Sequence, residues 1–358
     1  MHAISIPELK TFLEHVAIRS REPVFVWGQP GVGKSQAIEQ LVADLHVWPD
    51  WLLKINPRLR KLACRGRLVD IRLSQYDSVD LRGFPGVVND LTVWHAPSTL
   101  PFKGNPNFSE DELTVVFLDE ANAASPAVSA VCYQLVNEHR IGEHELMDNV
   151  LVIAAGNREG DRGVTNRQPL PLANRFTHIE VGVDVDAWCD HAQQIGLPPV
   201  AIAFYQFRKD LLSTFDPSKP DKSFSTPRTA VKAWNYYADD RMPVNVKQAA
   251  MAGAIGNGPA TEAWAFLDVW KDVLDYMPRI LKEPETIELP TEASMTYAIT
   301  VSISGNMNTE NIRAYYKFLT RLTPEFVVLA FQLATKRDKT LYDTPTFTQY
   351  ARTYKVIF

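Results

Sequence analysis

Gly28-Gln29-Pro30-Gly31-Val32-Gly33-Lys34-Ser35 decides the fold of this chain, because it matches the pattern G-x-x-x-x-G-K-[ST] in full. An apolar stretch, residues 23–27, precedes it, and apolar residues at helical spacing follow over residues 35–45. A glycine-rich loop between a strand and a helix lets backbone N–H groups converge on an anion, which the helix N-terminus also attracts. The stretch therefore predicts a phosphate-binding loop, to which we assign Gly28, Gln29, Pro30, Gly31, Val32, Gly33, Lys34, Ser35 and Gln36.

Two side chains at the end of this loop have the chemistry that a nucleoside triphosphate requires. The ammonium group of Lys34 can reach the β- and γ-phosphates, and the Ser35 hydroxyl can complete the ligand shell of Mg²⁺. The alternative is a glycine-rich loop that matches by chance. The strand before it and the helix after it argue against that alternative.

Strands and helices alternate over roughly residues 20–183, which predicts an α/β fold. After the strand before the loop, we expect further strands at 69–73, 114–118, 150–155 and 178–181, and Ser125-Pro126 begins a helix. Such alternation is typical of a mostly parallel sheet covered by helices on both faces. We therefore expect a nucleotide-binding domain over residues 1–183.

From residue 184 onward the strand pattern stops. Helices are expected at the following ranges: 186–195, 199–215, 227–239, 246–254 and 260–277. Pro278, Pro284 and Pro290 then precede a C-terminal part with about four short helices. The predicted organisation is an all-α lid over 184–277, followed by a linker and a helical C-terminal extension over 278–358.

Polar side chains end two of the predicted strands. Asp119 and Glu120 follow an apolar strand, and Asn157 closes the next one. Ligands bind at the carboxyl ends of parallel strands, so Asp119 is placed to hold Mg²⁺ together with Ser35. Glu120 can polarise an attacking water, and the Asn157 amide can orient that water. The alternatives are a solvated loop start for the acids and an ordinary turn for the asparagine.

Two arginines would complete a catalytic site. Arg175 precedes the last predicted strand and could face the γ-phosphate bound by a neighbouring subunit, as an arginine finger does. Arg228 follows Thr226-Pro227, a helix start, and could contact the bound phosphates. For either arginine alone a surface salt bridge is the more common explanation. Their occurrence beside the other motifs favours the catalytic interpretation.

These residues together resemble the MoxR family of AAA+ ATPases, of the helix-2-insert type. The resemblance covers about residues 5–275 and is carried by these segments: Gly28–Ser35, Asp80–Pro85, Val115–Glu120, Asn157, Pro169–Phe176 and Arg228. It implies the P-loop NTPase fold, hydrolysis of ATP with Mg²⁺ and a homo-oligomeric ring, commonly a hexamer. It also implies work with a von Willebrand factor A-type partner.

The sequence differs from the family pattern at one position, and its C-terminal part resembles the family less closely. The family pattern after the strand-end acids contains Asn-Arg, whereas here Asn122 is followed by Ala123, so any role of that arginine is missing. The C-terminal part looks similar to the tails of phage and bacterial MoxR-like proteins. We therefore expect a bacterial cytoplasm or the cytoplasm of a phage-infected host.

The family also has two β-hairpin inserts near the pore of its ring. Residues 87–94 alternate around an Asn-Asp turn and form one candidate, and residues 140–146 form the second. Trp94, at the end of the first hairpin, could grip a substrate chain. It could equally pack on the domain surface.

Composition excludes several other classes of protein. The chain has 358 residues, a formal net charge of −5 and three cysteines without short spacing, which favours a reduced cytoplasmic protein over a disulfide framework or zinc site. It lacks the pattern of a signal peptide, and no run of about 18 apolar residues predicts a membrane span. A cluster of cations could bind nucleic acid, although a solvated face or a ring interface is favoured: Arg58, Arg60, Lys61, Arg65 and Arg67.

We therefore expect a ring-forming AAA+ ATPase that uses ATP hydrolysis to remodel a protein partner. One alternative is a motor of the same fold that acts on nucleic acid, because the fold alone does not determine the substrate. A second alternative is a scaffold that binds ATP and assembles without turnover. The presence of Glu120, Asn157 and Arg175 argues against the scaffold, which would need none of them.

Overall fold

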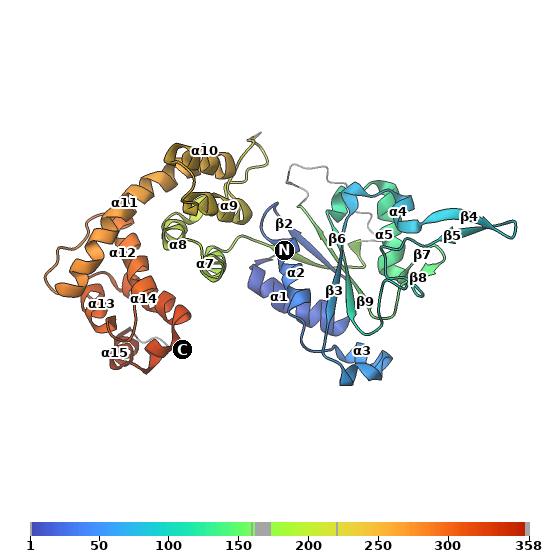
Figure 1. Cartoon of the computed structure of the whole chain (residues 1–358), viewed down its shortest axis with the longest axis horizontal. Helices are drawn as coiled ribbons and strands as arrows, with labels where there is room; N and C mark the ends of the chain where they lie inside the picture. The colour runs from blue at the N-terminus through green and yellow to red at the C-terminus, as the bar shows by residue number, and fades with distance from the viewer. Residues whose placement is uncertain (1, 159, 162–172, 220, 355–358) are drawn as a thin grey trace. The chain divides into compact units, whose positions relative to one another are not determined.

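A computed structural model describes residues 2–158, 160–161, 173–219 and 221–354 (Figure 1). The chain divides into two compact units. The first comprises Met1–Asp184 with Asp216–Pro220, and the second comprises Val185–Phe215 with Asp221–Phe358. Each unit is described by itself below.

The first unit is built on a six-stranded parallel sheet with the strand order β1-β10-β2-β9-β6-β3. Its strands are β1 (Ala3–Ile4), β2 (Val24–Gly28), β3 (Gly66–Arg72), β6 (Leu113–Asp119), β9 (Val150–Gly156) and β10 (Thr177–Val181). β2, which leads into the phosphate loop, lies between β9 and β10 although both come much later in the chain. The sheet thus brings the ends of sequence-distant strands together at one edge.

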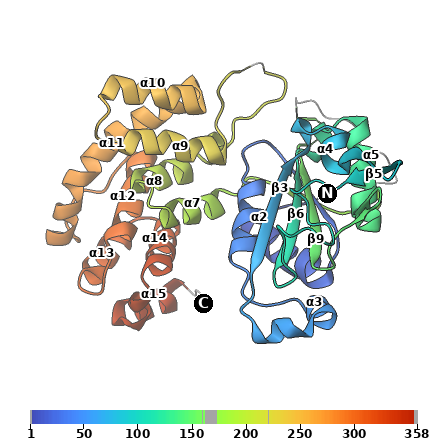
Figure 2. The same cartoon turned by 45° about the vertical axis from the view of Figure 1, so that its right-hand side comes forward.

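Both faces of this sheet are covered. On one face pack α1 (Ile6–Phe12), its π-helical continuation (Leu13–Ile18), α2 (Lys34–Ala43) and α3 (Asp50–Ile55). On the other pack α4 (Ser78–Arg82) and α5 (Pro126–Glu138), opposite α2 in Figure 2. Burial on both sides explains why β6 and β9 are almost continuously apolar. The predicted α/β fold, a parallel sheet covered on both faces and followed by helices, is confirmed.

In the described part of the first unit, 3₁₀ segments also lie at Pro57–Lys61, Leu73–Gln75 and Ala121–Ala123. The predicted cap of α5 is confirmed, since the Ser125 hydroxyl accepts a hydrogen bond from the backbone N–H of Val128 and Pro126 is the first helical residue.

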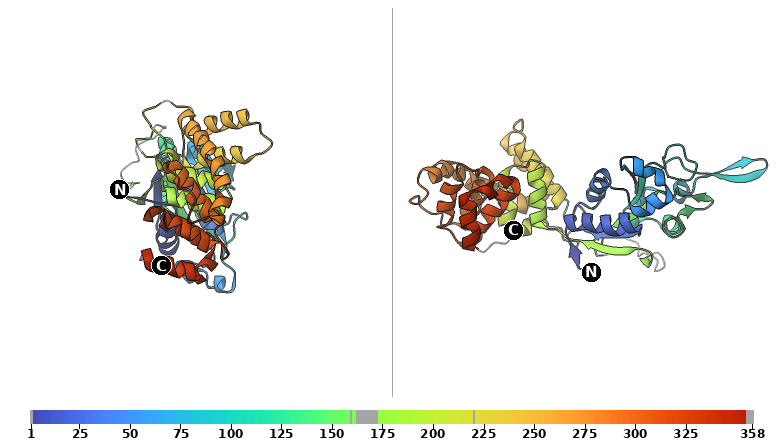
Figure 3. Two further views of the ribbon diagram at one scale, coloured as in Figure 1. Left: turned by 90° about the vertical axis from the view of Figure 1, so that its left-hand side faces the viewer. Right: turned by 90° about the horizontal axis from the view of Figure 1, so that it is seen from below.

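Two hairpins extend from the first unit, at the two places where hairpins were predicted. β4 (Phe84–Val88) and β5 (Leu91–His95) pair antiparallel across the turn Asn89-Asp90, and β7 (Arg140–Ile141) pairs with β8 (His144–Glu145). Asn89 and Asp90 have φ of 50° and 61°, the left-handed values that a two-residue type I′ turn requires. The right-hand view of Figure 3 shows β4–β5 projecting away from the sheet.

In the part that the structure describes, the second unit is helical. Its α-helices are α7 (Val185–Gln194), α8 (Pro199–Phe207), α9 (Pro227–Ala238), α10 (Val244–Ile255), α11 (Asn257–Lys282), α12 (Ala293–Asn306), α13 (Ile312–Leu319), α14 (Pro324–Arg337) and α15 (Pro345–Tyr354). The same described part contains 3₁₀ segments at Lys209–Leu212 and Lys339–Asp343. The helix expected over 199–215 is therefore interrupted after Phe207.

The expected boundary after residue 277 falls inside a helix. α11 continues through Pro278 to Lys282, because the packing of Met277 and Ile280, which are buried on either side of the proline, outweighs its preference for a helix break. α12 then packs against α8, α11 and α14 within the same unit. The C-terminal helices thus share a core with the helices expected to form the lid.

None of the helices in the described residues is both long enough and apolar enough to cross a membrane.

Cys132 and Cys189 are buried, and burial raises the pKa of each thiol to about 12.

Candidate functional site

The phosphate loop connects β2 to α2 at the carboxyl edge of the sheet. Gly31 and Gly33 have φ of 77° and 108°, which side chains rarely allow, so both positions require glycine. A Cβ atom at Gly28 would lie 2.9 Å from the carbonyl oxygen of Val181, so this position also has no space for a side chain. The three glycines of the motif are therefore explained by the backbone path of the loop.

Lys34 is the first residue of α2 and is buried, with 7% of its surface exposed. Its ammonium group donates to the carbonyl oxygens of Gly28 at 2.6 Å and Gln29 at 3.2 Å, and to Oδ1 of Asn157 at 3.3 Å. The structure therefore brings together the predicted phosphate-binding cation and the predicted amide at the end of β9. A ligand anion in the loop would find this cation fixed beside it.

Ser35 and Asp119 are also brought together. The Ser35 hydroxyl donates to Oδ2 of Asp119 at 2.8 Å, while the backbone N–H of Glu120 donates to Oδ1 at 2.9 Å. A hydroxyl and a carboxylate oxygen are the ligand types that Mg²⁺ prefers, and with phosphate oxygens and waters they suffice. In the described residues no group of three or more His, Cys, Asp or Glu side chains could hold a metal by itself. The pair therefore fits Mg²⁺ bound together with a nucleotide.

Glu120 adopts a left-handed backbone conformation, with φ of 54° and ψ of 33°. Its carboxylate accepts a hydrogen bond from the hydroxyl of Ser74, which lies in the 3₁₀ segment after β3. Ser74 was not among the predicted site residues. Its position becomes apparent only when β3 and β6 are seen to be neighbours in the sheet.

Asn122, buried with 3% of its surface exposed, positions Asn157. Its side-chain nitrogen donates to the carbonyl oxygen of Asn157 at 2.7 Å, and its Oδ1 accepts from the backbone N–H of Asn157 at 3.2 Å. Gly156 allows this approach, because a Cβ atom there would lie 2.4 Å from Oδ1 of Asn122. The two hydrogen bonds fix the end of β9 to the segment that follows β6.

An additional acid lies near the two strand-end carboxylates. Burial, and then the negative charge of Asp119, raises the pKa of Asp70 on β3, while Arg72 opposes this effect. Asp70 was part of a predicted strand but not of the predicted site. Its charge adds to the negative potential that would attract a cation to this edge of the sheet.

Arg158 follows Asn157 and was likewise not predicted. Its guanidinium group donates, at 3.4 Å in each case, to Oε1 of Gln29 in the phosphate loop, to Oε1 of Glu180 on β10 and to Oδ2 of Asp161. It therefore connects the loop to the ends of β9 and β10, the two strands that flank β2.

Arg175 is exposed and lies in a turn directly before β10. The structure does not bring its side chain to the phosphate loop of its own unit by any hydrogen bond between described residues. The preceding part of the family motif, residues 169–172, lies outside the described residues. A role in trans therefore stays a prediction.

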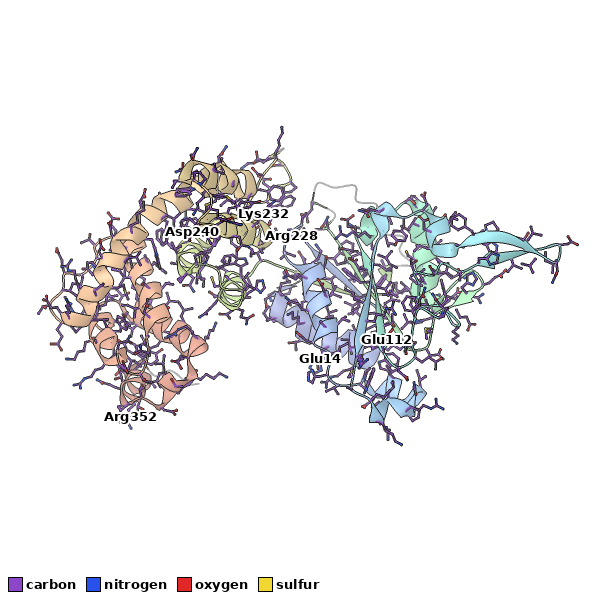
Figure 4. All side chains as sticks on the ribbon, viewed as in Figure 1. Glu14, Glu112, Arg228, Lys232, Asp240 and Arg352 are labelled. Atoms are coloured by element: carbon purple, nitrogen blue, oxygen red, sulfur yellow. The ribbon has the colours of Figure 1, made fainter. Side chains whose placement is uncertain are left out.

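Arg228 is exposed in the first turn of α9, one turn before Lys232 (Figure 4). The predicted helix start is confirmed, because Thr226 and Thr229 form a capping box and Pro227 is the first helical residue. Arg228 belongs to the second unit, so its contact with the phosphate loop also stays a prediction.

The structure also shows the contacts of Trp94 and of the predicted cation cluster. The guanidinium of Arg82 lies 4.5 Å from the ring centroid of Trp94, so one face of this half-buried indole is covered. Within the cation cluster, Arg67 pairs with Glu112 at 3.3 Å and lies 4.1 Å from the ring centroid of Phe108. Arg67 thus has a structural role, whereas Arg58, Arg60, Lys61 and Arg65 are exposed.

Comparison with known proteins adds little to this site. No protein-family model matches the chain, and no curated protein matches it. A crystal structure from Cytophaga hutchinsonii, of a protein named provisionally as an ATPase, is 11% identical with a TM-score of 0.37 and covers 93% of this chain and 81% of that one. NtrX from Brucella abortus in complex with ADP is 12% identical with a TM-score of 0.41, covering 99% of this chain and 70% of that one. The same protein with ATP gives 12% and 0.41, covering 99% and 69%. Similarities at this level carry no argument about activity.

Proposed function

We propose that this protein binds ATP with Mg²⁺ and hydrolyses it as an AAA+ ATPase of the MoxR type. The observation that carries the proposal is the joint geometry of Lys34 with Asn157 and of Ser35 with Asp119 around one glycine-rich loop. Hydrolysis of a phosphoanhydride requires little covalent chemistry from the protein, only positioned charges and a positioned water. The described side chains supply the charges and the polar groups that would position the water.

Each residue has a defined task in this proposal. The loop N–H groups and Lys34 bind the phosphates, while Ser35 and Asp119 would hold Mg²⁺, which neutralises the charge that develops on the phosphate oxygens. Glu120 accepts a proton from the attacking water once its hydrogen bond to Ser74 is released. Asn157, fixed by Asn122, orients that water.

The proposed assembly is a homo-oligomeric ring in which Arg175 acts across the interface between subunits. A head-to-tail interface would place the exposed Arg175 of one subunit at the γ-phosphate of the next. Arg228 would contact the bound phosphates. The sequence resemblance supports a hexamer and a von Willebrand factor A-type partner.

The β4–β5 hairpin favours a protein partner over nucleic acid. Phe84, Val87 and Leu91 are 64%, 78% and 69% exposed, and residues 84–95 contain no Lys or Arg. Exposed apolar side chains fit an apolar polypeptide, whereas nucleic acid binding depends on cations that contact phosphates.

Calorimetric titration with ATP and phosphate-release assays test the proposal. Lys34→Ala should abolish binding, whereas Glu120→Gln should bind ATP and lose turnover. Lys61→Ala and Glu143→Gln are matched controls, because both side chains are exposed. ATP binding by Lys34→Ala at parental affinity would contradict the phosphate-loop assignment, and parental turnover by Glu120→Gln would contradict the role of Glu120. Binding without turnover in the parent would favour the scaffold.

The ring is tested by mixing Arg175→Ala with Lys34→Ala subunits. Lys34→Ala alone should be inactive, and Arg175→Ala alone should hydrolyse ATP about 10³-fold more slowly than the parent. Mixed rings contain interfaces with an intact loop on one side and an intact Arg175 on the other. Recovery of turnover supports the role in trans, and its absence despite co-assembly contradicts it.

A further inference from the structure

The turn that carries Arg175 is fixed at both ends. The backbone N–H of Phe176 donates to the carbonyl oxygen of Ala173 at 3.3 Å, which closes a turn with Asn174 and Arg175 at its exposed tip. Phe176 is buried, and its ring is nearly perpendicular to that of Phe25, with a centroid distance of 5.4 Å. Arg175 is therefore presented to solvent from an anchored turn and not from a loose loop.

His178 provides a second anchor for the same turn. Its Nε2 lies 2.7 Å from the carbonyl oxygen of Ala173, and its Nδ1 lies 2.8 Å from Nε1 of Trp27. A carbonyl oxygen only accepts and an indole N–H only donates, so these partners select the tautomer with the proton on Nε2. Each ring nitrogen of His178 thus has one defined task.

The two partners of His178 belong to different parts of the proposed catalytic machinery. Trp27 lies on β2, directly before the first glycine of the phosphate loop. Ala173 begins the turn that carries Arg175. The Trp27 and His178 rings also stack, with centroids 5.9 Å apart and planes inclined by 24°. The imidazole therefore connects the strand that holds the phosphate loop to the turn that holds Arg175.

We propose that His178, together with Trp27, is a positioning residue for Arg175. This inference rests on the proposed ATPase function, and it adds a residue that neither the motifs nor the resemblance indicate. A finger acts only when its guanidinium reaches the transferred phosphate group in the right geometry, and a displacement of about 1 Å can cost 10²-fold in rate. By fixing the turn relative to β2, His178 sets where each subunit presents Arg175 to its neighbour.

The test compares two substitutions of the same ring. His178→Phe keeps an aromatic ring against Phe25 and Trp27 but loses both hydrogen bonds. His178→Gln keeps a side-chain N–H that can reach Ala173. We expect His178→Phe to bind ATP with parental Kd and to lose 10- to 100-fold in kcat, roughly the cost of a small misplacement, with His178→Gln closer to the parent. His15→Phe, at an exposed position, is the control.

Coupling to Arg175 separates positioning from a general structural role. The double variant His178→Phe/Arg175→Ala should be no slower than Arg175→Ala alone, because His178 acts only through that arginine. Additive losses would overturn the inference while leaving the ATPase proposal intact. Parental turnover of Arg175→Ala would overturn the inference and the proposed role of Arg175 in trans, while leaving the proposed ATP hydrolysis intact.

Hydrogen exchange gives a readout that is independent of activity. In His178→Phe without nucleotide, the amides of residues 174–177 should exchange about tenfold faster than in the parent, because one anchor of the turn is lost. The amides of β9, residues 150–156, should be unchanged. Equal exchange of residues 174–177 in both proteins would refute the inference even if the variant were slower.

Discussion

The Asn122 side chain occupies the space that a side chain at position 156 would need, so the effects of mutating Asn122 and Gly156 should not add. A double-mutant cycle measures this coupling. Asn122→Ala removes two hydrogen bonds, of 2.7 Å and 3.2 Å, and leaves the backbone N–H and C=O of Asn157 without these partners. A buried polar group that loses its partner costs about 1–3 kcal/mol, so we expect the first unit to lose about 2–4 kcal/mol of stability. ATP affinity should fall little, while turnover falls because Asn157 is no longer oriented.

Gly156→Ala should disrupt the same hydrogen bonds between Asn122 and Asn157 by steric overlap. The added Cβ atom would lie 2.4 Å from Oδ1 and 2.9 Å from Cγ of Asn122, so the amide must move and its hydrogen bonds break. Alone this should again cost about 2–4 kcal/mol. In the Asn122→Ala background the obstructing atoms are absent, and only the 3.1 Å approach to Phe25 remains, so about 1 kcal/mol or less should be lost.

Hydrogen exchange of the β9 amides as a function of urea reports the stability of the first unit without interference from the second. The expected coupling energy is at least about 1 kcal/mol. Losses that add to within about 0.5 kcal/mol would refute the argument, because independent sites behave in that way.

Three further predictions concern other contacts. Arg158→Ala should weaken ATP binding about threefold to tenfold by calorimetry, because Gln29 in the phosphate loop loses a hydrogen-bond donor. The stability should change by less than about 1 kcal/mol, because the contacts of Arg158 are long and its side chain is 41% exposed. Unchanged affinity would exclude a role of Arg158 in holding Gln29. Ser74→Ala should raise basal phosphate release about fivefold, since Glu120 loses a competing donor worth about 1 kcal/mol; a decrease would show that the serine positions the carboxylate for catalysis. Asp90→Gly should slow amide exchange across β4–β5 by stabilising the hairpin by about 0.5–1 kcal/mol, because φ at this position is 61°; faster exchange would contradict the turn assignment.

The local parts of the candidate site could be predicted from the sequence. The phosphate loop is one continuous stretch, and the strand that ends in Asp119 is marked by its uninterrupted apolar residues. The Asn-Asp turn predicted the first hairpin because only a few turns join two strands so tightly. Each of these features depends on neighbours within about ten residues.

The contacts between elements could not be predicted. Ser74 binds Glu120 because β3 lies beside β6, and Trp27 binds His178 because β10 lies beside β2. Neither pairing is encoded by local spacing. The predicted helix end at residue 277 was wrong because it relied on local propensity alone. Pro278 favours a helix break, but packing in the second unit overrides this preference, and α11 continues to Lys282.

The order of the strands has a consequence for how the chain is made. β2 is flanked by β9 and β10, so its apolar residues have no partner strand until the ribosome has added about 120 more residues, which takes roughly 6–25 s. During this interval Val-Phe-Val-Trp is a nascent segment prone to pair with any other exposed strand. We therefore expect co-translational chaperones to bind this N-terminal segment of the nascent chain. Slowing synthesis before residue 150 should increase aggregation more than slowing it after residue 181.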